Sequence, residues 1–278
     1  MESNWLYSIL MGILTGAASV LPVSVEAHQR ILLKFMGLRE IPALTALFIH
    51  LGIAAALYIC CQNHILKITR AIRLARIPKR KRKRPLDTRS LMDFSLLKTM
   101  LLPVVLSIFL YEKVSGMVSN LIIMAAFLFV NGLLLYIPQF LPSSNKDCRS
   151  LSRVEGLLMG LGGGLFIIPG LCGMGASLSV ASVSGVDRKY GLNMILLMHL
   201  GVTAGRMVLD VLNVLSASAV LISFWSLVFC LLAAVCAFFA TYFCVKWMRY
   251  LAGETGFAGF AYYSWGVALF TFILSLMA

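Results

Sequence analysis

The chain has 278 residues, of which 60% are hydrophobic and only 13% are charged. Its mean hydropathy is +0.91. The charged share is about half that of a typical soluble domain. So few charged groups cannot cover the surface of a soluble globular protein, so that class is excluded. Several stretches exceed the roughly 18 apolar residues of a membrane-spanning helix. We therefore predict an all-α polytopic membrane protein.

The net charge of +13 is concentrated in one stretch, since 11 of the 24 Lys and Arg residues lie between Lys67 and Arg89. Basic loops beside membrane helices are typical of the cytoplasmic side and are attracted to anionic lipids. We interpret this stretch as an anchor of topology and expect no nucleic-acid partner. Specific lipid or nucleic-acid recognition is the alternative. The predicted cytoplasmic loop covers residues 67–98.

The N-terminus and the cysteines carry weaker signals. Met1–Asn4 lacks the positive start of a signal peptide, so we expect the first apolar segment to be retained. The seven cysteines form no CxxC pair and have no metal-ligand spacing. We interpret most of them as small buried hydrophobes and expect no metal site among them.

Six apolar segments are predicted to cross the membrane once each. The loops that carry Lys and Arg alternate along the chain with loops that do not, as the positive-inside rule requires when the basic loops are cytoplasmic. This order predicts that both termini lie outside. The predicted spans are Ala43–Cys61, Lys98–Tyr111, Asn120–Phe140, Tyr190–Val214, Leu221–Cys244 and Phe257–Leu276.

Two further apolar stretches, residues 5–38 and 154–186, are interrupted. Leu21–Ser24 breaks the first, and Gly162–Gly164 and Pro169-Gly170 break the second. A single crossing by either stretch would violate the charge rule, whereas a re-entrant hairpin preserves it. Non-helical backbone at membrane depth survives only where protein or a polar cavity surrounds it. These breaks therefore indicate a functional site.

Short motifs recur in the two halves. Gly12–Gly16 (GILTG) is echoed 144 positions later by Gly156–Gly160, and His50–Gly52 (HLG) 149 positions later by His199–Gly201. Three spans per half would give the halves opposite orientations, as in many transporters with sites at the repeat interface. We predict one membrane domain made of two inverted repeats, residues 1–141 and 142–278. Two coincidental GxxxG packing motifs are the alternative.

The hairpins carry candidate site residues. Glu26 and His28 are two residues apart and can serve as acid and base or share a metal, although a hairpin mouth also tolerates such residues. Pro169–Ser177 offers glycine-rich backbone whose amides can hold a phosphate, although small residues also let helices cross closely. Arg206 and Asp210 have i,i+4 spacing within a span, so we expect an ion pair. Alternatively, Arg206 lines an anion site.

These motifs resemble a known family. Gly12–His28 resembles the first signature of the bacterial undecaprenyl-diphosphate phosphatases of the bacitracin-resistance type, and Pro169–Ser177 lies where that family has Pro-Gly-x-Ser-Arg-Ser-x-x-Thr. His50–Gly52 and Gly185–Arg188 also fit. The resemblance covers nearly the whole chain. It implies a bacterial inner-membrane protein with two re-entrant hairpins that acts on a polyprenyl lipid, recycles the carrier of peptidoglycan precursors, and by analogy forms a homodimer.

The chain departs from the family pattern at its reactive positions. Thr15 and Ser19 match the family's two glutamates, and Gly173 matches its arginine. Cys172 and Met174 match its serines. The remaining polar set retains Ser24 and His28, with Ser177 in place of threonine. These losses predict a protein that binds or translocates the lipid phosphate without hydrolysis, through the candidate residues Ser24, His28, Gly170, Gly173, Ser177 and Arg206.

Two alternatives stay open. An active undecaprenyl-diphosphate phosphatase with a rearranged site would use His28, Glu26 or Cys172, with Arg206 as the replacement cation and Mg or Ca as the metal. A membrane subunit that docks a partner protein would use the basic arm Lys67–Arg89.

Overall fold

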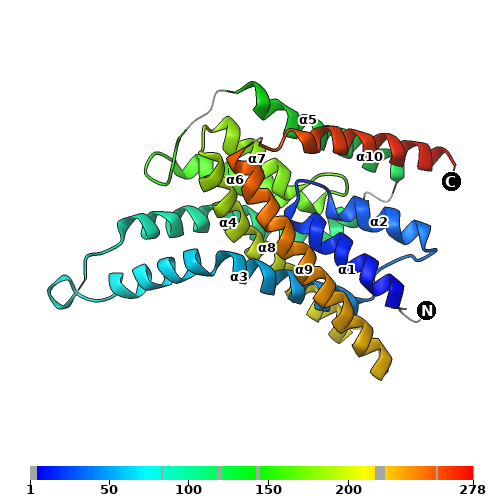
Figure 1. The fold of residues 1–278 in the computed structure, drawn as a ribbon, viewed down its shortest axis with the longest axis horizontal. Coiled ribbons are helices and arrows are strands. Elements are labelled where there is room, and N and C mark those ends of the chain that lie inside the picture. The colour runs from blue at the N-terminus through cyan, green and yellow to red at the C-terminus, as the bar shows by residue number, and fades with distance from the viewer. Residues whose placement is uncertain are drawn as a thin grey trace.

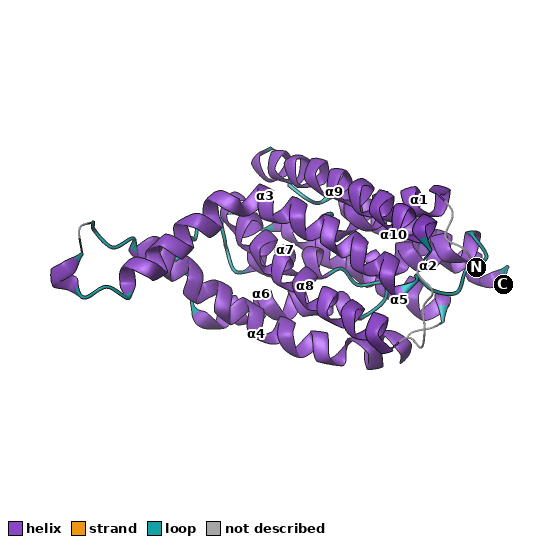
Figure 2. Cartoon of the chain, turned by 90° about the horizontal axis from the view of Figure 1, so that it is seen from below, coloured by secondary structure: helices purple, strands orange, loops and turns teal. Residues whose placement is uncertain are grey.

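The computed structural model describes residues 5–82, 84–117, 120–141, 145–216, 223–254 and 256–277. Over these residues the chain forms ten α-helices, three short 3-10 turns and no strand beyond one isolated bridge (Figures 1 and 2). The all-α prediction is confirmed.

Among the described residues, six helices are long and apolar enough to cross a membrane, which confirms the polytopic class and the six predicted spans. The predicted start of the fifth span, Leu221, and the predicted repeat boundary at residue 142 lie outside the described residues. The six helices are α3 (Ala43–Ala75), α4 (Thr88–Met117), α5 (Leu121–Tyr136, continued by the turn η2, Ile137–Phe140), α8 (Arg188–Ser216), α9 (Phe224–Gly253) and α10 (Gly259–Leu276).

The predicted loop over residues 67–98 is wrong in extent. Helix α3 continues to Ala75 and α4 begins at Thr88, and the turn η1 (Lys79–Lys81) is the one regular element between them among the described residues. Lys and Arg are good helix formers, so a run of charge does not end a helix by itself; α3 ends just before Pro78, which disfavours helix in the preceding residue. The two helices project together beyond the bundle (Figure 1).

Each of the two interrupted stretches forms a helix–turn–helix, and its re-entry on one side of the membrane stays a prediction. The first joins α1 (Trp5–Val20) to α2 (Val25–Phe35), and the second joins α6 (Arg153–Gly164) and the turn η3 (Leu165–Ile167) to α7 (Gly173–Val183). Both breaks at proline are confirmed.

The turn and the glycines of the second hairpin have separate roles. The turn passes through Gly170 with φ of +105°, a conformation that favours glycine. The predicted break at Gly162–Gly164 falls at the end of α6, because these glycines are its last three residues and the turn η3 follows. They also serve close packing, since a Cβ on Gly163 would meet the side chain of Met198.

The echoed glycine motifs pack in corresponding ways. Helix α1 lies on α9, and α6 lies on α4. A Cβ on Gly16 would lie 2.5 Å from the carbonyl oxygen of Ala237, and one on Gly160 would lie 2.2 Å from that of Met100. Both GxxxG motifs are therefore close-packing surfaces. This exchange of partners between halves is compatible with two related repeats, and the inverted repeat itself stays a prediction.

The bundle has two distinct ends. The described ends of α1 and α10 lie at one end, and the loop between α3 and α4 lies at the other (Figures 1 and 2). This arrangement is compatible with both termini lying on one side of a membrane. Which side each end faces stays a prediction.

Candidate functional site

The tips of the two hairpins touch inside the bundle. The Gly170 N–H donates to Oγ of Ser24 over 3.1 Å, and Sγ of Cys172 donates to the Leu21 carbonyl over 3.6 Å. Ser24 also caps α2 by accepting the N–H of Ala27, and its side chain is fully buried. Each turn therefore holds the other in place.

A cavity of about 60 Å³ lies beside these tips. Both hairpins and the helices α3 and α8 contribute to its walls. The five signature positions at which the chain departs from the resembling family all line it, namely Thr15, Ser19, Cys172, Gly173 and Met174. The two signatures, about 150 residues apart in the chain, thus meet at one site.

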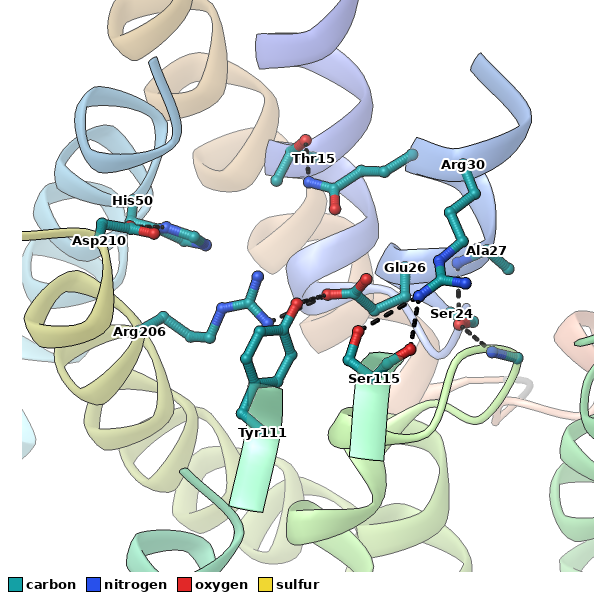
Figure 3. A network of polar contacts seen from close by, with 12 residues as sticks. Thr15, Ser24, Glu26, Ala27, Arg30, His50, Tyr111, Ser115, Arg206 and Asp210 are labelled. Atoms are coloured by element: carbon teal, nitrogen blue, oxygen red, sulfur yellow. Dashed lines mark hydrogen bonds and ion pairs between the residues drawn. The ribbon is translucent and has the colours of Figure 1, made fainter. Parts of the chain in front are cut away.

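A buried charge pair borders this cavity (Figure 3). Nη1 of Arg206 donates to Oε1 of Glu26 over 3.1 Å, and the two side chains are only 15% and 11% exposed. The Tyr111 hydroxyl donates to the same carboxylate oxygen. The guanidinium of Arg206 also lies over the Tyr111 ring, 3.9 Å from its centroid, which is cation–π geometry. Three helices, α2, α4 and α8, therefore converge on one carboxylate.

The prediction of an ion pair between Arg206 and Asp210 is wrong. Oδ2 of Asp210 instead contacts Nδ1 of His50 over 2.6 Å, and both side chains are buried. The i,i+4 spacing puts the two charges on one face of α8, but each meets a closer partner from a different helix. The pair from α3 and α8 lies on the far side of Arg206 from Glu26 (Figure 3).

A larger groove of about 910 Å³ adjoins the cavity and shares its walls at Thr15, Glu26, His50 and Arg206. The charge pair therefore stands between the small cavity and the groove. The groove walls also carry basic side chains at the end of the bundle away from the loop between α3 and α4, including that of Arg30. Nη2 of Arg30 donates to the Ser115 carbonyl over 2.9 Å.

Several predicted site residues do not line the cavity. Nε2 of His28 contacts the Tyr263 hydroxyl at 2.8 Å, and the two rings are stacked. Residues two apart on a helix point in different directions, which explains why Glu26 faces the site and His28 faces α10. Ser177 donates to the Met159 carbonyl over 2.8 Å and is fully buried.

The remaining predicted residues divide in the same way. Ser24 and Gly170 shape the hairpin contact and are not part of the cavity wall, whereas Glu26, Cys172, Gly173 and Arg206 are part of it. The Cys172 thiol is occupied by two contacts, because it also accepts the Gly175 N–H over 3.3 Å.

The sequence reasoning missed three residues of the site. Tyr111 ends a predicted span and carries no motif. His50 and His199 belong to echoed motifs, and His50–Gly52 fits the family pattern, but neither histidine is predicted to belong to the site. His199 lines the cavity and is 7% exposed, and its Nε2 is buried without a hydrogen-bond partner among the described residues. The echoed motif was a usable signal, because a buried imidazole within a span requires a reason.

Residues 8–270 match the protein family described as Bacitracin resistance protein BacA. The chain belongs to the BacA family. It is similar to proteins named undecaprenyl-diphosphatase from Methanobrevibacter smithii (26% identical, 97% of each chain covered) and Carboxydothermus hydrogenoformans (25%, 94% of each). Another from Halothermothrix orenii is 23% identical over 96% of each chain. Family membership confirms the resemblance and fits a role with the lipid carrier of cell-envelope synthesis.

The departures from the BacA signatures concern one place in the fold. The positions that match the signature glutamates and arginine face a single cavity, where this chain has Thr15, Ser19 and Gly173. One carboxylate, Glu26, and one guanidinium, Arg206, border the same cavity from other positions. The BacA scaffold is thus kept around a different set of polar groups.

A divalent cation does not fit this set of residues. Mg²⁺ and Ca²⁺ prefer several oxygen ligands, usually with more than one carboxylate. The cavity offers the single carboxylate of Glu26, which Arg206 and Tyr111 already engage. Within the described ranges, no three His, Cys, Asp or Glu side chains are placed to share a metal.

Proposed function

We propose that this BacA-family protein binds the phosphate headgroup of a polyprenyl lipid carrier and translocates it across the membrane without hydrolysis. We place it in the bacterial inner membrane with the loop between α3 and α4 in the cytoplasm. One observation carries the proposal: the cavity wall has Thr15, Ser19 and Gly173 at the positions that match the reactive residues of the family.

Phosphoryl transfer needs groups that activate a nucleophile and stabilise the charge of the transition state. The Thr15 hydroxyl accepts a hydrogen bond from Gln29, so its own proton can be donated to a phosphate, and it does not provide a strong base. The cavity chemistry therefore favours holding the headgroup over breaking its phosphoanhydride bond. The inverted-repeat plan of the two halves suits alternating access to such a site.

Arg206 is the cation that we assign to the headgroup. In the structure its charge is balanced by Glu26, so an entering phosphate must compete with that carboxylate. The competition allows the headgroup to be released again, which a translocated ligand requires. Tyr111 keeps the guanidinium in place by stacking, whichever anion it binds.

The second candidate is an active undecaprenyl-diphosphate phosphatase with a rearranged site. The presence of Glu26 and Arg206 on the cavity wall favours it, because a carboxylate and a guanidinium are the chemical types that the signature positions lack. If this candidate is right, the protein releases phosphate and the release depends on Glu26. The proposed non-hydrolytic role predicts no phosphate release.

Binding of undecaprenyl phosphate to the purified protein, followed by native mass spectrometry, tests the proposal. Arg206→Gln removes a charged hydrogen-bond donor worth about 1.5–3 kcal/mol, so we expect at least roughly tenfold weaker binding. Lys98→Gln is the matched control, because Lys98 is an exposed cation on α4 that contacts Phe94. Equal binding by the wild type and Arg206→Gln would contradict the proposal.

A further inference from the structure

A second groove lies at the other end of the bundle. Its volume is about 670 Å³, and α3, α4, α8 and α9 form its walls beside the loop between α3 and α4. Three of these helices, α3, α4 and α8, also form the groove beside Arg206. On α8 the lining residues Asn193 and Arg206 are 13 positions apart, which is about 20 Å along a helix. We call the second groove the inner groove.

Four cationic side chains line the inner groove, one from each of its helices: Lys67, Arg89, Lys189 and Arg249. Among the described residues, Arg89 alone of the four forms an ion pair, with Asp147 at the long distance of 3.7 Å. Arg249 donates from Nη2 to the Cys60 carbonyl over 2.9 Å, whereas its Nε is buried and has no hydrogen-bond partner in the part of the chain that the structure describes.

Two of the carboxylates in this groove serve helix ends. Asp87 accepts the N–H of Ser90 over 3.1 Å and its hydroxyl over 2.7 Å, and these bonds lower the pKa of Asp87. Asp187 accepts the N–H of Tyr190 over 2.8 Å. Both are capping contacts at the first turns of α4 and α8. Neither carboxylate lies within ion-pair distance of a cation among the described residues.

The third carboxylate, Asp93, is buried and has its own donors. It accepts the Tyr190 hydroxyl over 2.8 Å and contacts Nε2 of His64 at 3.2 Å. The acidic side chains of the inner groove are therefore occupied by other donors. Among the described residues, the amino groups of Lys67 and Lys189 and the Arg249 N–H groups other than the one on Cys60 remain available to an anion.

We propose that the inner groove is a second anion site, for a phosphate or diphosphate group borne by a lipid headgroup or present as free phosphate. Positive charge near the cytoplasmic face explains exposed lysines by topology alone. It does not explain a guanidinium nitrogen buried without a partner, because such burial is unfavourable unless the group forms a hydrogen bond. The inference extends the proposed translocation, since a transported headgroup needs a binding place at each end of its path.

The double variant Lys189→Gln/Arg249→Gln tests this site in the full-length protein in lipid nanodiscs. The double substitution is introduced into the wild-type protein and into the Arg206→Gln variant. Each groove is thereby altered alone and together with the other. The probes are undecaprenyl phosphate, measured by native mass spectrometry, and inorganic phosphate, measured by calorimetry. Lys246→Gln is the matched control, because this cation of α9 contacts Tyr242 and is not part of the inner groove.

We expect the double substitution to weaken the binding of at least one probe tenfold, both in the wild-type background and in the Arg206→Gln background. Loss of lipid binding alone assigns the site to a headgroup, and loss of phosphate binding as well assigns it to free phosphate. Unchanged binding of both probes would overturn the inference. An effect of the double variant without any effect of Arg206→Gln would contradict the proposed function and leave the inner groove supported. If the double variant does not fold, Lys189→Gln and the charge-retaining Arg249→Lys take its place, with weaker binding expected for the first only.

Discussion

Arg206 on α8 reaches across the bundle and donates a hydrogen bond to Glu26 on α2 over 3.1 Å. The contact joins the first hairpin to a long helix of the second half, beside the point where the two hairpin tips meet. Two buried charges thereby balance each other at a depth where an unpaired charge is strongly unfavourable. The pair links the two elements, and in the proposed function it also occupies the cation that the lipid headgroup binds.

Replacing Glu26 should separate these two effects. In Glu26→Gln the guanidinium loses its balancing charge, so we expect the free energy of unfolding to fall by about 3 kcal/mol. Binding of undecaprenyl phosphate should become tighter, because the phosphate no longer competes with a carboxylate. Thermal unfolding in detergent with and without the lipid measures both effects. Arg206→Gln should lower both stability and binding; weaker lipid binding by Glu26→Gln would refute the competition.

We expect the His199 side chain to lower the stability of the folded protein. An unsatisfied buried polar group costs about 1–3 kcal/mol, so we expect His199→Leu to unfold at a higher temperature than the wild type. His50→Leu is the matched comparison, since it breaks the contact with Asp210 and should lower the unfolding temperature. A loss of stability in His199→Leu would show that the imidazole has a partner in the folded protein.

The echoed glycines should be equally intolerant of a methyl group. A Cβ on Gly16 or Gly160 would lie within 2.5 Å of a backbone oxygen of the neighbouring helix, and overpacking of this kind costs about 1–3 kcal/mol. Gly16→Ala and Gly160→Ala should therefore both be destabilising. Gly266→Ala on α10 is the control, because no atom lies within 4 Å of its added Cβ. Similar unfolding temperatures for all three variants would argue against the packing account.

The sequence predicted the spans and hairpins well because apolar length and proline breaks act locally. It misplaced the ends of α3 and α4 because lysine and arginine favour helix as readily as they favour a basic loop. The signature positions, such as Thr15 and Cys172, gather at one cavity as their motifs suggested. The orientation of His28 depends on the packing of whole helices, as does the partner of Arg206, and no local pattern encodes either.

The most direct test of the central claim is phosphate release from undecaprenyl diphosphate by the purified protein, with Mg²⁺ or Ca²⁺ added. Lipid retained by the protein is measured in the same samples, and His28→Ala and Glu26→Gln serve as comparison variants. The account predicts retained lipid and no release above the protein-free background. Robust release that is lost in either variant would contradict it and establish hydrolysis at a rearranged site.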